Sequence, residues 1–420
     1  MKKLVILGGG TGGTLMANKL RKALPADDWK ITLVDKEPNH YYQPGLLFIP
    51  FGLYKKEDII KPKKKFYPKN IEVLFAEIDK IEPEKNHVLL SDMGMLNYDY
   101  LIIATGSETR PDQIDGMTGK LWRKSIFDFY TLDGALALAD FFSTWKGGRL
   151  VVNIAEMPIK CPVAPMEFAF LADDYFKKRG MREKVDLTFV TPLPGAFTKP
   201  VCSEVLGGTL KKRKIKVESE FAIGHVDNEQ RKIVSWDDRE VPFDVLVAVP
   251  TNMGSRAIQR SGMGDELNFI PTDKHTLQSK SWENIFVIGD ATDLPTSKAG
   301  SVAHFEGDIV LQNFMDMISG RMPSASFDGH SNCFIESGDG KGMLIDFNYD
   351  TEPLTGKFPI PGLGPFSLLE ETAINHWGKL MFKWLYWNAI IKGRELPFVS
   401  SEMSMAGKKI PKEKNEVVTF

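Results

Sequence analysis

Hydrophobic positions along the chain fall into short blocks that are separated by polar connections. Apolar runs that read as buried strands lie at residues 4–7, 30–34, 98–106, 150–154 and 284–290. Directly after the first run, Leu15–Leu20 has helical spacing instead. Buried strands alternating with helices predict an α/β fold in three layers with parallel sheets, and the same βαβ topology occurs twice.

The first strand leads into a glycine turn of the GxGxxG pattern. Gly8, Gly10 and Gly13 occupy the three glycine positions, Thr11 lies between them, and a helix follows. Such glycines let the backbone approach a pyrophosphate, and the helix N-terminus supplies donors to it. Asp35 ends the second strand, where a carboxylate can accept hydrogen bonds from a ribose. The alternative is a turn that only packs helix on strand, but this order of elements favours a dinucleotide site.

Two later strand ends give the chain a resemblance to a known family. One strand ends in Ala-Thr-Gly and another in Gly-Asp, and with the glycine turn they resemble the flavoproteins that have two dinucleotide-binding domains. The resemblance implies FAD as cofactor, with its ADP half on the first glycine motif and Asp290 near the ribityl phosphate. Residues 295–303 also resemble the flavin-contacting loop of that family. The further FAD contacts implied are Ala104, Thr105, Gly106, Gly289, Lys298 and Ala299.

The resemblance also implies a domain organisation with two Rossmann-like domains. Residues 1–112 and 248–330 are expected to form the FAD-binding domain in two parts. Residues 113–247 are expected to form the second Rossmann-like domain, inserted between them. Residues 331–420 remain as a C-terminal region with a redox cysteine, a quinone site and a membrane anchor.

A second nicotinamide site would need its own glycine motif after the strand at 150–154. The following segment, Ala155–Lys160, contains no glycine, and the Glu156 carboxylate would repel a pyrophosphate. We therefore expect this domain to have lost NAD(P)H.

Cys161 stands at the position where that glycine motif would end. Pro162 is expected at the first helical position, which would make Cys161 the helix cap. There the helix dipole and Lys160 would lower the pKa of the thiol. A buried structural cysteine is the alternative, but the lost glycines favour a redox role.

The segment Lys160–Pro165, "KCPVAP", looks like the cysteine-proline segment of sulfide:quinone oxidoreductases and of the flavoprotein subunit of flavocytochrome c sulfide dehydrogenase. In these proteins two redox cysteines flank the flavin, and Cys333 matches the second. The resemblance implies that hydrosulfide attacks a Cys161–Cys333 disulfide or polysulfide bridge, and that two electrons then pass to FAD and to quinone. It suggests Cys161 as the persulfide carrier and Cys333 as the flavin-side thiolate.

The sequence also departs from that family. Many of its quinone reductases have a third essential cysteine where this chain has none, at 124–130, and histidines where 191–199 has none. Cys202 and His304 are expected to be structural. Glu167 would relay protons or, as the more ordinary alternative, face solvent or form a salt bridge. Tyr41-Tyr42 stands where the flavocytochrome type attaches FAD covalently, so we expect no covalent bond there.

The stretch 373–391 predicts an amphipathic helix rich in tryptophan. Its expected polar stripe is Asn375, Lys379 and Lys383, and its expected apolar stripe is Leu380, Trp384, Trp387 and Ile391. Interfacial aromatics with snorkelling lysines suit a monotopic membrane anchor, whereas packing on the core or in a dimer interface is the alternative.

Two loops complete these expectations. In the preceding loop, 358–366, we expect Phe366 to contact quinone. The basic segment 61–65 is expected to be a solvated loop, and anionic lipid headgroups are the alternative partner.

Composition and charge argue against several classes of function and location. The net charge of -2 gives no general attraction to nucleic acid, and three cysteines without metal-site spacing fit neither a disulfide scaffold nor a metal centre. The first strand begins at Lys3, which leaves no room for a signal peptide, so synthesis in the cytoplasm is expected. No apolar run is long enough to span a bilayer, so a peripheral position on the membrane is expected, and a homo-oligomer stays open.

The function favoured by these observations is an FAD-dependent sulfide:quinone oxidoreductase on the membrane that produces sulfane sulfur or polysulfide. Three alternatives stay open. They are a sulfide dehydrogenase that donates to a cytochrome, a type II NADH:quinone oxidoreductase, and a catalytically silent FAD-dependent scaffold or sulfur sensor.

Overall fold

The computed structural model describes residues 1–396 and 398–410. Its first sheet is parallel, with five strands in the order β20-β9-β1-β2-β5. These strands are β1 (Lys2–Leu7), β2 (Trp29–Asp35), β5 (Glu72–Phe75), β9 (Tyr100–Ile103) and β20 (Ile285–Val287). Because successive side chains of a strand point to opposite faces, the buried strand β1 contributes to two cores at once.

Each face of the first sheet is covered. Helices α1 (Thr11–Ala23) and α7 (Gly300–Ile318) pack on one face. The antiparallel strands β6 (Ile78–Glu82), β7 (His87–Leu90) and β8 (Gly94–Asn97) pack on the other, next to the short helix α6 (Arg256–Ser261). The unit therefore has the three layers that the sequence predicts.

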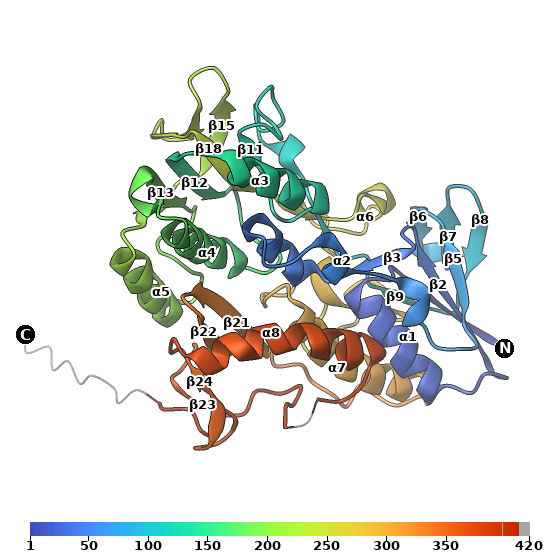
Figure 1. Ribbon diagram of the computed structural model, residues 1–420. Helices are drawn as coiled ribbons and strands as arrows, with labels where there is room; N and C mark the ends of the chain where they lie inside the picture. Colours follow the sequence, from blue (N-terminus) through green and yellow to red (C-terminus); the bar gives the residue numbers. More distant parts are fainter. Residues whose placement is uncertain (397, 411–420) are drawn as a thin grey trace, which may run out of the picture.

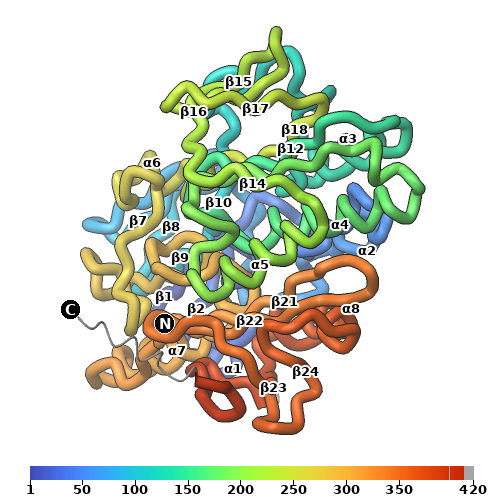
Figure 2. The backbone as a smooth tube through the Cα atoms, turned by 90° about the vertical axis from the view of Figure 1, so that its left-hand side faces the viewer, coloured from blue at the N-terminus to red at the C-terminus, as the bar shows by residue number. Residues whose placement is uncertain are grey.

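The second sheet is also parallel and has the order β11-β18-β12-β13-β14. Its strands are β11 (Ile126–Phe127), β12 (Gly148–Ile154), β13 (Val185–Val190), β14 (Lys216–Glu218) and β18 (Val245–Val249). The helices α3 (Leu132–Thr144), α4 (Ala164–Lys178) and α5 (Pro200–Lys212) share one core with it. The opposite face packs on a small sheet that Figure 2 shows at its top: β15 (Ile223–Asp227), β16 (Lys232–Ser235) and β17 (Glu240–Pro242).

The C-terminal region builds a third, four-stranded sheet in the order β21-β22-β24-β23. Its elements are β21 (Ser331–Gly338), β22 (Lys341–Phe347), β23 (Gly356–Ile360) and β24 (Gly364–Leu368). Helix α8 (Ala373–Asn388) packs on β21 and β22 and is followed by a 3-10 turn, η7 (Ile390–Lys392). In Figure 1 this orange-red helix runs across the lower part of the molecule, and the turn η7 that follows it contacts α1 and α7.

Short elements join the units. Strands β10 (Ser107–Thr109) and β19 (Asn252–Gly254) pair with each other where the chain leaves and re-enters the first unit. The segment between β2 and β5 contains β3 (Asn39–Tyr41), the 3-10 helix η1 (Gln43–Phe51), α2 (Lys56–Ile59), β4 (Ile60–Pro62) and the turn η2 (Lys63–Lys65). This segment packs against α8 and η7 in one apolar cluster.

The prediction of an α/β fold with parallel, Rossmann-like units is confirmed by this topology. The four predicted segments, with boundaries at 112, 247 and 330, stay our proposal for the domain limits. Residues 397 and 411–420 of the last segment lie outside the described residues. No helix in the described part of the chain is long and apolar enough to cross a membrane.

The two stripes predicted for the C-terminal helix do not separate its buried residues from its exposed ones. Asn375 and Lys379 are buried, because their side chains bond to groups of the third sheet and of α4. Trp387 and Ile391 of the expected apolar stripe are buried as well. The face that is exposed is itself apolar and consists of Ile374, Trp377, Met381 and Trp384. We call these four residues the exposed apolar stripe.

Candidate cofactor and redox site

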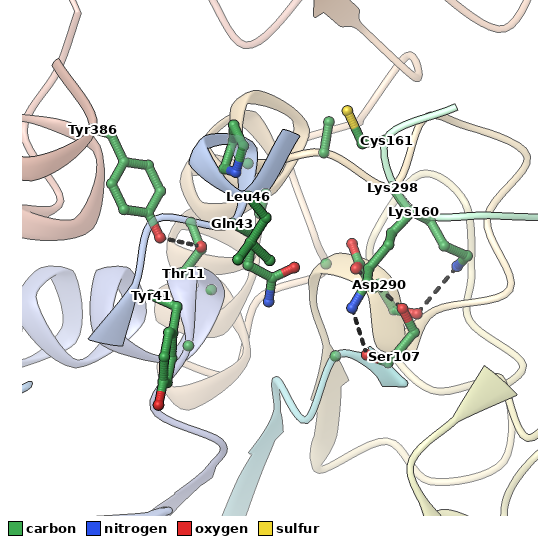
Figure 3. Close-up of a pocket in the computed structure, with 18 of the residues that line it drawn as sticks. Thr11, Tyr41, Gln43, Leu46, Ser107, Lys160, Cys161, Asp290, Lys298 and Tyr386 are labelled. Atoms are coloured by element: carbon green, nitrogen blue, oxygen red, sulfur yellow. Dashed lines mark hydrogen bonds between the residues drawn. The ribbon is translucent and has the colours of Figure 1, made fainter. Parts of the chain in front are cut away.

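The strand ends of the first and second sheets open into one cavity of about 430 Å³. Most of the residues predicted from the sequence line it: Gly8, Gly10, Thr11, Asp35, Ala104, Thr105, Gly106, Cys161, Gly289, Asp290, Lys298, Ala299 and Cys333. Figure 3 shows part of this lining, with Cys161, Lys160 and Lys298 on one side and Thr11 and Tyr386 on the other. The carboxyl ends of parallel strands are the usual place for a dinucleotide in such sheets.

The glycine turn has the form that a pyrophosphate requires. Gly8 has a φ of +94°, and a Cβ there would lie 2.3 Å from the carbonyl oxygen of Ala104. At Gly10 a Cβ would meet no atom within 4 Å, so the backbone there stands open to the cavity. The hydroxyl of Thr105 is buried without a hydrogen-bond partner in the described structure. An open glycine backbone at a helix start and an unused hydroxyl together fit a bound dinucleotide.

Gly13 does not line the cavity, although the sequence predicts a cofactor contact. A Cβ on Gly13 would lie 1.7 Å from the carbonyl oxygen of Gly8. Its role is therefore to let α1 approach the end of β1, which is the packing function of the third glycine in this motif.

Asp35 lies at the cavity edge with both carboxylate oxygens engaged. It accepts a hydrogen bond from the backbone N–H of Gly9, and Glu37 N–H donates to its Oδ1 at 2.7 Å. Lys63 Nζ pairs with Oδ2 at 2.7 Å, and both side chains are nearly buried. The basic segment is thus not a solvated loop at this position, because Lys63 turns inward and orients the predicted ribose acceptor.

A hydrogen-bonded chain that the sequence does not reveal joins α8 to the glycine turn. The Tyr386 hydroxyl lies 2.8 Å from Thr11 Oγ1 and 2.6 Å from His40 Nε2 (Figure 3 shows the first contact). Burial, followed by the charge of Lys63, lowers the pKa of His40 to about 4, so its ring is neutral near pH 7. The nucleotide turn is therefore braced by a residue 375 positions away.

Lysines at the other end of the cavity are turned toward backbone carbonyls. Lys298 Nζ donates to the carbonyl oxygens of Asp290 at 3.1 Å and Thr292 at 2.6 Å, and Lys160 Nζ donates to that of Ser107 at 3.4 Å. Burial lowers the pKa of both lysines. The Ser107 hydroxyl donates to Asp290 Oδ2 at 3.2 Å, as Figure 3 shows. These contacts fix the Gly-Asp strand end against the loop that carries Cys161.

Cys161 does not cap a helix. Helix α4 begins at Ala164, with Val163 as its N-cap, and Cys161 sits before it with a φ of +50°. The backbone of Cys161 is held from both sides: its N–H donates to the Lys298 carbonyl at 2.8 Å, and its own carbonyl accepts from Ala164 N–H at 2.9 Å. Cys333 comes from β21, and both cysteines are half-buried free thiols.

The predicted lowering of the Cys161 pKa is also wrong. Burial, and next the carboxylate of Glu167, raise the pKa of Cys161 to about 12. Lys160 gives no help, because its ammonium is directed to Ser107. Burial and the neighbouring Cys161 raise the pKa of Cys333 as well. At neutral pH both side chains are therefore thiols in this environment.

A buried ion pair lies beside the two thiols. Lys379 Nζ of α8 contacts Glu167 Oε1 of α4 at 2.6 Å and donates to the Phe334 carbonyl at 2.8 Å. Burial acts to lower the pKa of Lys379, but Glu167 and the two cysteines outweigh it, and the pKa is raised. The same Glu167 oxygen accepts from the Glu336 N–H at 2.6 Å. The salt-bridged alternative for Glu167 is thus correct, and the residue is fully buried.

The remaining predicted residues lie outside the cavity. Cys202 and His304 are buried, as expected of structural residues, and burial raises the pKa of Cys202 to about 12. Phe366 does not line the cavity, but its ring packs edge-on against Phe334, which does, at 5.0 Å between centroids.

Comparisons with known proteins agree with this geometry. Residues 2–152 match the model of the pyridine nucleotide-disulphide oxidoreductase family. A mitochondrial sulfide:quinone oxidoreductase of Dictyostelium discoideum is 28% identical over 93% of this chain and 86% of its own. A sulfide-quinone reductase of Aquifex aeolicus is 29% identical over 70% of this chain and 69% of its own. The X-ray structure of the Aquifex aeolicus sulfide:quinone oxidoreductase has a TM-score of 0.77 at 22% identity, covering 94% of this chain and 92% of that one.

The protein is accordingly a flavoprotein oxidoreductase with FAD as its cofactor. Within that class its sequence is similar to those of sulfide:quinone oxidoreductases.

The two glycines of the turn give a matched test of their separate roles. We expect Gly13→Ala to lower the free energy of unfolding of the FAD-free protein by about 1–3 kcal/mol, because its Cβ must displace backbone. Gly10→Ala has room for its Cβ, so it should change that free energy by less than about 1 kcal/mol and instead weaken FAD binding. Chemical denaturation and FAD titration measure the two effects. Equal destabilisation by both variants would contradict the assignment.

The charge of Glu167 gives a second prediction. In Glu167→Gln the carboxylate that raises the pKa of Cys161 is lost, so that pKa should fall. Alkylation of Cys161 by iodoacetamide at a fixed pH below that pKa should then accelerate, by about tenfold for each pKa unit. Mass spectrometry of the labelled peptide follows the rate in folded protein. Glu336→Gln is the control, and an unchanged rate in Glu167→Gln would show that the carboxylate does not set the pKa.

Proposed function

We propose that the protein is a sulfide:quinone oxidoreductase in which Cys161 and Cys333 form the redox pair. The observation that carries the proposal is that both cysteines, from separate elements, line the cavity formed by the dinucleotide-binding strand ends. The names of the two relatives described above support sulfide as electron donor and quinone as acceptor.

The two cysteines supply the sulfur chemistry in this proposal. With the pair oxidised to a disulfide, hydrosulfide attacks one sulfur, a new S–S bond forms, and the Cys161–Cys333 bond breaks. One cysteine then carries a persulfide and the other leaves as a thiolate. Lys379, which is charged and close to both thiols, stabilises that thiolate. A second hydrosulfide that attacks the outer sulfur of the persulfide carries it away as sulfane sulfur or polysulfide and frees that cysteine. The two cysteines then re-form their bond only by giving up two electrons, for which FAD would be the acceptor.

FAD is expected to lie along the residues that connect the glycine turn to the cysteines. Gly8, Gly10 and Thr11 would bind its phosphates, Asp35 its ribose, and Asp290 the ribityl side. When bound, FAD supplies a two-electron acceptor and donor between the thiol pair and the quinone.

The proposal excludes NADH as the donor on the basis of the loop after β12. A type II NADH:quinone oxidoreductase of Staphylococcus aureus is 24% identical over 85% of this chain, so the related activity has to be weighed. In this chain Ala155–Cys161 has no glycine, and the Glu156 carboxylate accepts a hydrogen bond from Thr251 at 3.2 Å. A fixed carboxylate at this strand end repels a second pyrophosphate.

Quinone access is proposed to run along helix α8. Its inner side contributes Lys379, Phe382 and Tyr386 to the cavity, while its outer side is the exposed apolar stripe. Trp377 is 67% exposed and Trp384 is 63% exposed, which suits a helix lying in the interfacial region of a membrane. Phe366 remains our proposal for a quinone contact, acting through the Phe334 ring that it packs against.

The decisive experiment is an anaerobic titration of the FAD-loaded protein that follows flavin absorbance. Sulfide should bleach the flavin, decyl-ubiquinone should restore the absorbance, and NADH should have no effect. Cys161→Ser and Cys333→Ser should each slow bleaching by sulfide about a thousandfold or more, because each removes one partner of the exchange. Cys202→Ser is the matched control. Its flavin should bleach at the rate of the unmodified protein, since Cys202 is a buried residue of α5 that does not line the cavity.

Bleaching by NADH would contradict our interpretation of the loop at 155–161. Normal turnover with both cysteines replaced would contradict the proposed redox pair. A flavin that sulfide does not bleach in the unmodified protein would instead favour a catalytically silent scaffold or sensor.

A further inference from the structure

A group of lysines lies beside the exposed apolar stripe, and it comes from two distant parts of the sequence. Lys61 and Lys65 belong to β4 and η2, whereas Lys383 lies on α8 and Lys392 on η7. We call these four residues the lysine cluster. They come together because the segment between β2 and β5 packs on α8 in one apolar core.

Aromatic rings of that core hold two of the lysines in place. Lys61 Nζ lies 4.6 Å from the centroid of the Trp387 ring, and Trp387 in turn stacks on Phe66. Lys383 Nζ lies 3.9 Å from the centroid of the Tyr54 ring. Each ammonium is thus held by a cation–π contact. Lys383 precedes Trp384 directly in the sequence, and the Trp387 that holds Lys61 follows Trp384 by about one helical turn.

The cluster carries uncompensated positive charge. The ion pairs nearby use Lys56 and Lys63 instead, and within residues 1–396 and 398–410 no member of the cluster forms one. Burial, and then the charges of Lys383, Lys65 and Lys392, lower the pKa of Lys61. The charged groups that act on Lys61 are therefore other cations. Bringing these cations together does not stabilise the isolated folded protein.

We propose that the lysine cluster is a binding site for the headgroups of anionic phospholipids. The proposal rests on the membrane association in the proposed function and adds the class of lipid. Tryptophans of the exposed apolar stripe enter the interface, and the lysines at its flank then meet the phosphate layer. Anionic phosphate groups compensate the repulsion among the four lysine ammonium groups. Headgroups without net charge do not.

From the sequence, the basic segment 61–65 was interpreted as one unit. In the structure its lysines have different surroundings. Lys63 turns inward to Asp35 and serves the cofactor site. Lys65 is exposed and Lys61 is half-buried, and both join Lys383 and Lys392, which the sequence places in a different region. The lipid alternative therefore applies to part of the segment only.

Vesicle co-sedimentation of the FAD-loaded protein tests the proposal. The probes are vesicles of phosphatidylcholine alone and of phosphatidylcholine mixed with phosphatidylglycerol. The unmodified protein should bind both and should prefer the anionic vesicles, with a preference that decreases as salt is added. Lys61→Gln with Lys383→Gln should reduce that preference roughly fivefold for each lysine and leave binding to the neutral vesicles unchanged.

Lys146→Gln with Lys184→Gln is the matched control. These exposed lysines lie at the amino ends of β12 and β13, on the edge of the second sheet away from the cavity. The control should retain the full preference for anionic vesicles. Trp377→Ser with Trp384→Ser should weaken binding to both kinds of vesicle, because it removes the apolar contact that the two share.

The outcomes separate the two proposals. Equal binding of the unmodified protein to both vesicles, or equal loss in the cluster variant and its control, would overturn the lipid site and leave membrane association standing. Binding to neither vesicle would overturn membrane association itself and the lipid site with it.

Discussion

The ion pair between Glu167 and Lys379 is the contact on which the arrangement of the site depends. It joins α4 of the second unit to α8 of the C-terminal unit at 2.6 Å, and both side chains are almost fully buried. Removing one partner of such a pair leaves an uncompensated buried charge, which typically costs about 3–5 kcal/mol. Since Cys161 precedes α4 and Cys333 lies on the strand beneath α8, the position of each cysteine relative to the other follows from this pair.

Burial sets the chemistry of the two cysteines as much as their position. A resting thiol with a raised pKa is a poor nucleophile at neutral pH and is protected from alkylation and oxidation. In the proposed mechanism the attacking sulfur therefore comes from outside, as a small anion that enters the cavity. Lys379 would favour a thiolate there once the proposed bond between the cysteines has been broken.

Local patterns predicted the parts of the structure that depend on neighbouring residues. The strands, the glycine turn and the two strand ends are of this kind, because periodicity and backbone freedom are properties of short segments. Pairing between distant residues was not predictable in the same way. Nothing near Lys379 in the sequence shows that its charge meets Glu167, so the sequence does not reveal which side of α8 is buried. The raised pKa of Cys161 was missed for the same reason, since it comes from burial in the assembled fold and from the Glu167 carboxylate.

The bracing of Thr11 by Tyr386 bears on how the protein matures. The first sheet obtains its edge strand β20 only from residues 285–287, and the nucleotide turn obtains its hydrogen-bond partner later still. During synthesis the glycine motif leaves the ribosome first, but the residues that surround it in the folded protein are synthesised almost last. Capture of the flavin is thereby deferred to the end of translation, so a truncated chain would carry the fingerprint of a flavoprotein and remain colourless.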